Sequence, residues 1–309
     1  MECGEIFTIK WLSKGIFKMM GKKKPRISLP IFLQLPATII IWSLVAFVLP
    51  WLIYASFHSS IPGKGFVFVG LNNYFKLFSD KRVYESLLRT AYYSGAGATT
   101  EVFLGMIIAL ALVNAIKNEK VRFGVLLLFL IPMMFSEAIV ANMWLLLVNP
   151  AGYINSLLRT FNLPRINWLG TEMALTTIMI ADIWQWTSLP LLLIYASRSS
   201  IPKEFYEYAN LERLSSWQTF RVVTWPHIKS AVAVSFLLRL IFMNIYIDKI
   251  IVLTYGGPGF ASEILGFYIY LQSFQYGASG YSATLSLITL IIIGVLTYVF
   301  WKFMRLGRV

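Results

Sequence analysis

The chain has 309 residues, of which 58% are hydrophobic and only 13% are charged, and its formal net charge is +13. Soluble domains carry roughly 25% charged residues, so this composition excludes an ordinary soluble domain and indicates a protein of the lipid bilayer. In a membrane protein an excess of Lys and Arg reflects the loops on one side of the membrane, and we therefore infer no nucleic-acid partner. The single cysteine, Cys3, excludes a disulfide within the chain, and two distant histidines indicate no metal site.

Six apolar stretches are each long enough to cross a bilayer, which needs about 20 apolar residues per helix. The sequence therefore predicts an all-α membrane protein with six transmembrane helices. We expect residues 1–30 to form a basic tail and residues 31–309 to form the membrane domain. The predicted spans are 31–57, 87–115, 123–148, 173–196, 230–253 and 281–303.

The basic residues divide unevenly between the two sides that these spans define. Eighteen Lys and Arg lie in the two tails, the second–third connection and the fourth–fifth connection, whereas six lie in the other connections. The positive-inside rule then predicts that both termini and the connection 199–229 are cytoplasmic. In the N-terminal tail, Lys10, Lys14, Lys18 and Lys22 recur at helical spacing. Either a surface helix on anionic membrane lipid or a solvated tail that only sets topology would explain that pattern.

The connection 199–229 is polar and helix-prone, although it lies between two apolar spans. Pro202 suits the first turn of a helix, and Glu204 and Glu207 favour the N-terminal half of that helix. Ser215 and Gln218 have the spacing of a capping box, which predicts the start of a second helix. Pro226 is then expected to end that helix before the next span. The connection is thus predicted to be a cytoplasmic helix-turn-helix.

Many apolar side chains accompany these polar ones, more than a solvated linker needs, and such a patch typically marks a partner site. They are Phe205, Tyr206, Tyr208, Leu211, Leu214, Trp217 and Phe220.

The connection carries a recognisable order of residues: Ile201, Pro202, Glu204, Glu207, Tyr208, Ala209 and then Trp225–Pro226. This order resembles the EAA loop of the inner-membrane permeases of binding-protein-dependent ABC importers, especially the carbohydrate-type, MalF-like branch. Two departures from that pattern concern the loop. Tyr208 replaces the first Ala, and Arg213 stands where the family has a Gly that can take positive φ. Two more stretches, Phe66 to Tyr74 and Leu253 to Pro258, are similar to the family's F-V-G-L-x-N-Y and L-T-x-G-G-P segments.

The resemblance implies a permease subunit of an ATP-driven sugar importer that itself catalyses no reaction. It implies a multi-pass protein of a prokaryotic plasma membrane that acts with a second, MalG-like permease, two ATPases that bind ATP and Mg²⁺, and an extracytoplasmic sugar-binding protein. The loop would dock on an ATPase, with Glu207 as the polar anchor and Ala209 permitting close approach. The ATPase-coupling residues are then Glu204, Glu207, Tyr208, Ala209, Arg213, Trp217 and Pro226.

Polar residues inside the spans are costly and usually face a cavity or a partner. Neutral sugars are bound by hydrogen bonds and aromatic faces, so a polar and aromatic set at membrane depth predicts a sugar path. Structural ion pairs of Arg239 with Glu101 or Glu137, and tryptophans acting as interface anchors, remain alternatives. Ala91, Gly95 and Thr99, spaced by four, are expected to permit close helix packing. The predicted path residues are Asn142, Asp182, Trp184, Gln185, Asn244 and Asp248.

Two other functions remain open. An importer for another solute, such as glycerol phosphate, would need a concentrated basic site, and only Arg239 lies deep in a span. A secondary transporter independent of an ATPase would need paired repeats and an ion site, and the sequence has no internal repeat.

Overall fold

The computed structural model describes residues 29–61 and 65–306, with side chains for residues 33–60 and 65–302. The predicted tail helix therefore lies outside the described residues, as does the predicted basic tail apart from residues 29 and 30. The chain divides into two compact units, residues 1–52 and 53–309. In the first unit the described residues belong to α2 (Leu29–Ser56), whose last residues belong to the second unit.

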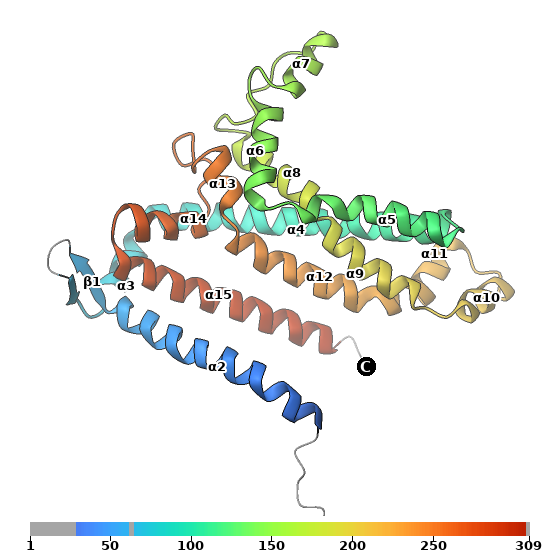
Figure 1. Cartoon of the computed structure of the whole chain (residues 1–309), viewed down its shortest axis with the longest axis horizontal. Helices are drawn as coiled ribbons and strands as arrows, with labels where there is room; N and C mark the ends of the chain where they lie inside the picture. Colours follow the sequence, from blue (N-terminus) through green and yellow to red (C-terminus); the bar gives the residue numbers. More distant parts are fainter. Residues whose placement is uncertain (1–28, 62–64, 307–309) are drawn as a thin grey trace, which may run out of the picture. The chain divides into compact units, whose positions relative to one another are not determined.

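The second unit is almost entirely helical (Figure 1). A short hairpin of β1 (His58–Ile61) and β2 (Gly65–Phe68) pairs His58 with Phe68 and Ile61 with Gly65. The remaining elements follow in chain order: α3 (Asn72–Ser79), α4 (Lys81–Ala115), α5 (Glu119–Met134), α6 (Glu137–Val148), α7 (Tyr153–Thr160), α8 (Ala174–Trp186), α9 (Ser188–Ser199), α10 (Lys203–Leu211), α11 (Ser216–Thr219), the π-helix η1 (Phe220–Thr224), α12 (Trp225–Ile245), α13 (Asp248–Leu253), α14 (Leu265–Tyr270), the π-helix η2 (Leu271–Gln275) and α15 (Ser279–Leu306).

Among the described residues, five helical segments are long and apolar enough to span a membrane, or six if α5 and the following helices count as one bent span. The all-α class is therefore confirmed, but the prediction of one straight helix over 123–148 is wrong. α5 ends at Met134, and the chain turns by 93° before the next helix. Pro132 lacks a backbone donor, and Ser136 caps α6 by accepting from the amide of Ile139 at 3.4 Å.

The fifth predicted span, 230–253, also differs from the structure. A continuous helix of 30 residues runs from Ser216 through η1 to Ile245, and α13 begins after a two-residue break. The prediction that Pro226 ends a helix is wrong. The turn before it widens to a π-turn in which the amide of Trp225 donates to the carbonyl of Phe220. This wider turn accommodates the proline, which has no N–H to donate.

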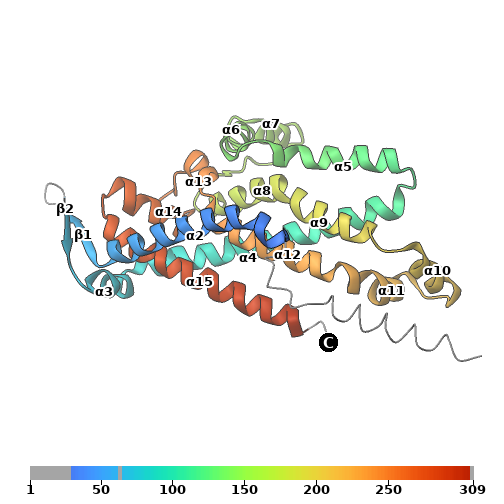
Figure 2. The same cartoon turned by 60° about the horizontal axis from the view of Figure 1, so that its bottom comes forward.

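The hairpin and the helix-turn-helix lie at opposite ends of the second unit (Figures 1 and 2). At the hairpin end, Asn73 is buried and donates to the carbonyls of Ser56 and His58 at 2.8 and 2.9 Å. Gly70 takes a φ of +60°, which a residue with a side chain rarely adopts. The Phe66 to Tyr74 segment thus shapes the end of the bundle.

α4 is the central helix of this unit and packs against α8, α9, α12 and α14. Small residues permit its close approach to neighbours, but not those that the four-residue spacing predicted. No atom outside the local helix lies within 4 Å of a Cβ added at Gly95, and Ala91 and Thr99 are exposed. Instead, Ala98 and Ala109 are fully buried, and Gly105 faces the start of α9.

A first prediction follows from Gly105. A Cβ added there would lie 2.7 Å from the backbone nitrogen of Leu191 and 2.8 Å from the Cβ of Pro190. We expect Gly105→Ala to force α4 and α9 apart and to lower the free energy of unfolding by roughly 1–3 kcal/mol. The matched change Gly95→Ala meets no neighbour and should be neutral or stabilising by up to about 1 kcal/mol. Thermal unfolding of both purified variants tests this, and equal unfolding temperatures would contradict it.

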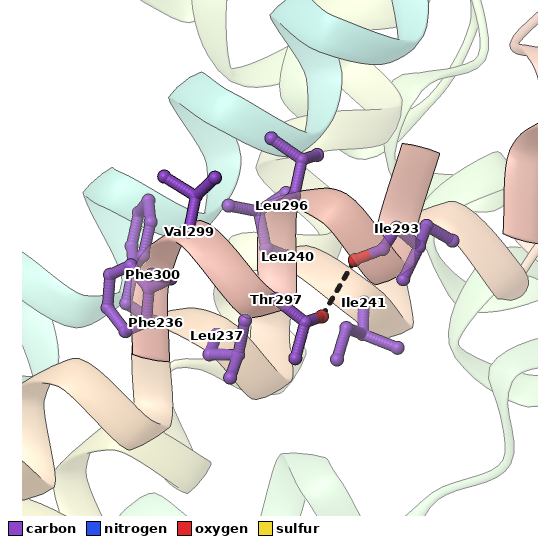
Figure 3. A pocket seen from close by; sticks show the side chains of 9 residues that line it. All are labelled: Phe236, Leu237, Leu240, Ile241, Ile293, Leu296, Thr297, Val299 and Phe300. Atoms are coloured by element: carbon purple, nitrogen blue, oxygen red, sulfur yellow. Dashed lines mark hydrogen bonds between the residues drawn. The ribbon is translucent and has the colours of Figure 1, made fainter. Parts of the chain in front are cut away.

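α12 and α15 leave an apolar groove with a cavity volume of about 280 Å³. Its one hydroxyl, on Thr297, donates to the carbonyl of Ile293 in its own helix at 2.7 Å and offers no free polar group (Figure 3). The groove is therefore suited to hydrocarbon rather than to a polar solute. Its lining residues are Phe236, Leu237, Leu240, Ile241, Ile293, Leu296, Thr297, Val299 and Phe300.

Candidate functional site: the helix-turn-helix and the buried charges

The turn that follows α10 is a Schellman motif with an arginine in the position usually taken by glycine. Arg213 has a φ of +53°. Its amide donates to the carbonyl of Asn210 at 3.0 Å, and the amide of Leu214 donates to the carbonyl of Ala209 at 3.0 Å, which is the bonding pattern of that motif. Arg213 thus keeps the turn expected of a glycine, at a cost of roughly 1–2 kcal/mol.

The second helix of the loop begins as predicted. Ser215 Oγ accepts from the amide of Gln218 at 3.3 Å, and Gln218 Oε1 accepts from the amide of Ser215 at 2.8 Å. This capping box fixes where α11 starts. Trp217 in that first turn stacks on Phe220 with ring centroids 5.5 Å apart, yet 68% of its surface stays exposed.

Of the predicted coupling residues, all except Ala209 are exposed. Glu204, Glu207 and Tyr208 lie on α10, Arg213 lies in the turn, and Trp217 and Pro226 lie on the second helix. Tyr208 is 68% exposed and Leu211 is 77% exposed. The loop therefore presents a surface on which acidic and aromatic groups are mixed.

Ala209 has a different environment from the others. It is 3% exposed and belongs to a buried cluster with Ile201, Val223 and Ile228. The close approach predicted for this alanine is thus to residues of its own chain. Tyr206 strengthens the same contact, because its hydroxyl lies 3.0 Å from that of Thr224. α10 is consequently held against the base of the long helix that becomes α12.

A chain of buried charges joins the helices deeper in the bundle. Arg239 on α12 pairs with both oxygens of Glu101 on α4, and its Nη2 also donates to Asp182 on α8 at 2.7 Å. The side chains of Arg239 and Glu101 are 0% exposed and that of Asp182 is 5% exposed. Of the ion pairs that the sequence left open, that of Arg239 with Glu101 is the one formed.

Lys249 extends this chain to the bend of the third span. Its Nζ donates to Asp182 at 2.6 Å and pairs with Glu137 on α6. Glu137 also accepts from Nε1 of Trp186 at 2.7 Å, and Trp186 stacks on Tyr246 at 6.0 Å. Three carboxylates thus share two cations. Lys249 and Trp186 are not among the path residues that the sequence predicts, since only the fold brings the start of α13 beside α6.

The predicted path residues do not form one cluster. Asp182 is held in the charge chain, and Gln185 is buried with its Nε2 donating to the carbonyl of Phe135 at 2.9 Å. Trp184 is 41% exposed, with its ring 6.4 Å from that of Trp144. The side-chain amides of Asn142 and Asn244 donate within their own helices at 2.8 and 2.6 Å. Asp248 is exposed in the first turn of α13.

Near the hairpin end, Asp80 caps α4 and joins it to two later elements. Its Oδ2 accepts from the hydroxyls of Tyr268 and Tyr281 at 2.7 Å each. Burial opposes ionisation, but these hydroxyls and the amide of Arg82 lower the pKa of Asp80 below its ordinary value. Beside it, Arg82 forms a two-point ion pair with the buried Glu263. These contacts anchor the chain that follows the Leu253 to Pro258 turn.

In the described part of the chain, no group of three or more His, Cys, Asp and Glu side chains is placed to hold a metal ion. The buried chain holds three carboxylates against two cations. The exposed aromatic and acidic groups lie on the helix-turn-helix.

The sequence of the chain is similar to those of known transport proteins. Residues 101–303 match the family described as the inner membrane component of binding-protein-dependent transport systems. The trehalose/maltose transport permease MalF of Thermococcus litoralis is 33% identical over 253 residues, covering 80% of this chain and 83% of that protein. The multiple sugar-binding transport permease MsmF of Streptococcus mutans is 30% identical over 238 residues, covering 75% of this chain and 79% of that protein.

A solved structure shows the same fold. A chain from the crystal structure of a bacterial ABC transporter that imports the acidic polysaccharide alginate superimposes with a TM-score of 0.76. The superposition covers 91% of this chain and 96% of that one at 21% identity.

Proposed function

Because the chain belongs to the family of inner membrane components of binding-protein-dependent transport systems, which transport and do not catalyse, we propose that it forms half of the translocation path of an ATP-driven sugar importer. The observation that carries this proposal is the exposed helix-turn-helix, joined to one long helix at the end of the bundle. Relatives named for trehalose, maltose and multiple sugars support a sugar as the solute.

In this proposal the helix-turn-helix docks on an ATPase subunit, and Glu207 supplies the polar contact. ATP and Mg²⁺ bind to two such ATPases, a second permease completes the path, and an extracytoplasmic binding protein delivers the sugar. The protein lies in the plasma membrane of a prokaryote with both termini in the cytoplasm. Nucleotide binding then selects between two packings of the bundle through the docked loop.

The path is proposed to pass the break between α12 and α13. Asn244 and Asp248 flank this break, and the rings of Trp186, Phe242 and Tyr246 contact one another beside it. Amide and carboxylate groups suit sugar hydroxyls, and aromatic rings suit the C–H faces of sugars. Asn142 is proposed to extend this lining, whereas Trp184 lies in the wall of the apolar groove between α4, α5 and the α8–α9 segment. Asp182 and Gln185, both buried, are proposed to support it from behind.

The proposal predicts that changes in the path lower sugar transport without preventing assembly with the ATPase. Asn244→Ala and Asp248→Ala should each lower sugar uptake about two- to tenfold, the loss of one hydrogen bond, while the ATPase still co-purifies. Asn72→Ala, an exposed amide on α3, is the control. The assay uses the complete transporter in proteoliposomes and asks which sugar, loaded on the binding protein, stimulates ATP hydrolysis. Stimulation by no sugar, but by another solute, would refute the assignment of sugar.

A further inference from the structure

Two arginines lie at the loop end of the bundle, and part of each has no partner within the described chain. Arg198 ends α9 with its guanidinium 4.1 Å from the ring centroid of Tyr206, and its Nη2 donates to Oδ1 of Asn114 at 3.2 Å. Arg122, early in α5, lies 6.0 Å from the ring centroid of Tyr195. Across residues 29–61 and 65–306, neither buried Nε has a hydrogen-bond acceptor.

The local charge favours an anion that comes from outside the chain. Arg122 contacts Tyr195, which lies three residues before Arg198 on α9, so both arginines lie near the same turn of that helix. The carboxylate nearest to Arg122 is that of Glu119, which is 3.8 Å away and 85% exposed. Buried donors that lack acceptors cost free energy, and one phosphate group offers enough oxygens for both arginines.

An apolar groove lies farther along the same helices, toward the middle of the bundle. It lies between α4, α5 and the α8–α9 segment, with a cavity volume of about 470 Å³. Phe129 in its wall is seven residues after Arg122, and Leu191 is seven residues before Arg198. Seven residues are two helical turns, so each arginine shares a helix face with the groove and lies roughly 10 Å from it along the axis.

We propose that Arg122 and Arg198 bind the phosphate group of an anionic phospholipid whose acyl chain lies in this groove. Val121 and Phe123, which flank Arg122, are 52% and 57% exposed apolar side chains, so the site borders hydrocarbon as well as headgroups. A soluble phosphate or a partner's carboxylate would satisfy the arginines but would leave the groove unexplained. Arg198 also contacts the ring of Tyr206 on α10, so the bound lipid would stabilise the position of the helix-turn-helix.

Native mass spectrometry of the purified full chain tests the site with phosphatidylglycerol and phosphatidylcholine of identical acyl chains. Wild type should retain phosphatidylglycerol on the order of tenfold more strongly, as expected for charge-assisted hydrogen bonds. Arg122→Gln should abolish most of that preference. This arginine makes no side-chain hydrogen bond within the described residues, so the variant is expected to fold. Lys120→Gln, an exposed lysine of the same turn, should keep the preference within twofold.

Two further arms separate a lipid from a free anion. Leu128→Trp, a 64% exposed position in the groove wall, should weaken phosphatidylglycerol retention several-fold, whereas Leu127→Trp, outside the lining, should not. Millimolar inorganic phosphate should displace little lipid. Equal retention of the two lipids by wild type, equal effects of the arginine and lysine variants, or full displacement by phosphate would each overturn the proposal. None of these readouts requires sugar transport, so failure of the proposed function would leave this inference standing.

Discussion

Replacing Arg239 by methionine is expected to lower the stability of the bundle by about 3–5 kcal/mol, the largest loss that we predict for one side chain. The guanidinium is fully buried and pairs with Glu101 and Asp182 on two other helices. Methionine fills a similar volume but leaves Glu101 without its ion-pair partner and leaves Lys249 as the one cation for Asp182 and Glu137. Thermal unfolding of the purified chain measures the loss.

Two companion variants make the result specific to the buried charge. Glu101→Gln combined with Arg239→Met restores the charge balance and should recover part of the lost stability. Lys81→Met removes a cation whose side chain is 91% exposed. It should lower the free energy of unfolding by less than about 1 kcal/mol. If Arg239→Met unfolded at the wild-type temperature, the charge chain would have no structural role.

The second large effect concerns the helix-turn-helix. Glu207→Arg should reduce ATP-driven uptake at least a hundredfold while the protein still inserts and folds, because a buried, charge-reversed contact with a partner costs several kcal/mol. Glu207 is exposed on α10, so the change removes no packing within the chain. Uptake and ATPase stimulation in proteoliposomes are the readouts.

Glu212→Arg is the matched control for that variant. It makes the same change of charge at an exposed residue where α10 ends, and a cation there is favourable to the helix dipole. We expect it to keep more than about half of the uptake. Normal transport by Glu207→Arg would refute the coupling assignment, and equal losses in both variants would show that only the total charge of the loop matters.

The sequence was sufficient to predict the class, four of the six spans and the capped start of the second loop helix, because hydrophobic length and capping spacing are local signals. It also contained a signal for the bend, since Pro132 is followed closely by Ser136 and Glu137, a proline and then a helix start. We instead interpreted Glu137 as a charge within one straight span. The partners of Lys249 were beyond prediction, because they depend on how α6, α8 and α13 pack together.

The turn at Arg213 shows a related limit. A non-glycine residue at that position could either tolerate the strain of a positive φ or use a different turn. The choice depended on tertiary contacts that hold Ala209 and Leu214 in one apolar cluster. Those contacts offset the backbone strain, and no local pattern reports them.

The widened turn at η1 has a mechanical consequence. Because the helix is unbroken from Ser216 to Ile245, its 30 residues form a rod of about 45 Å. A break at Pro226 would absorb a push applied at Trp217, whereas an unbroken helix would carry that push as a tilt over its whole length. The far end of this lever arm is Asn244, so a small displacement at the surface becomes a sideways swing where the sugar is proposed to pass.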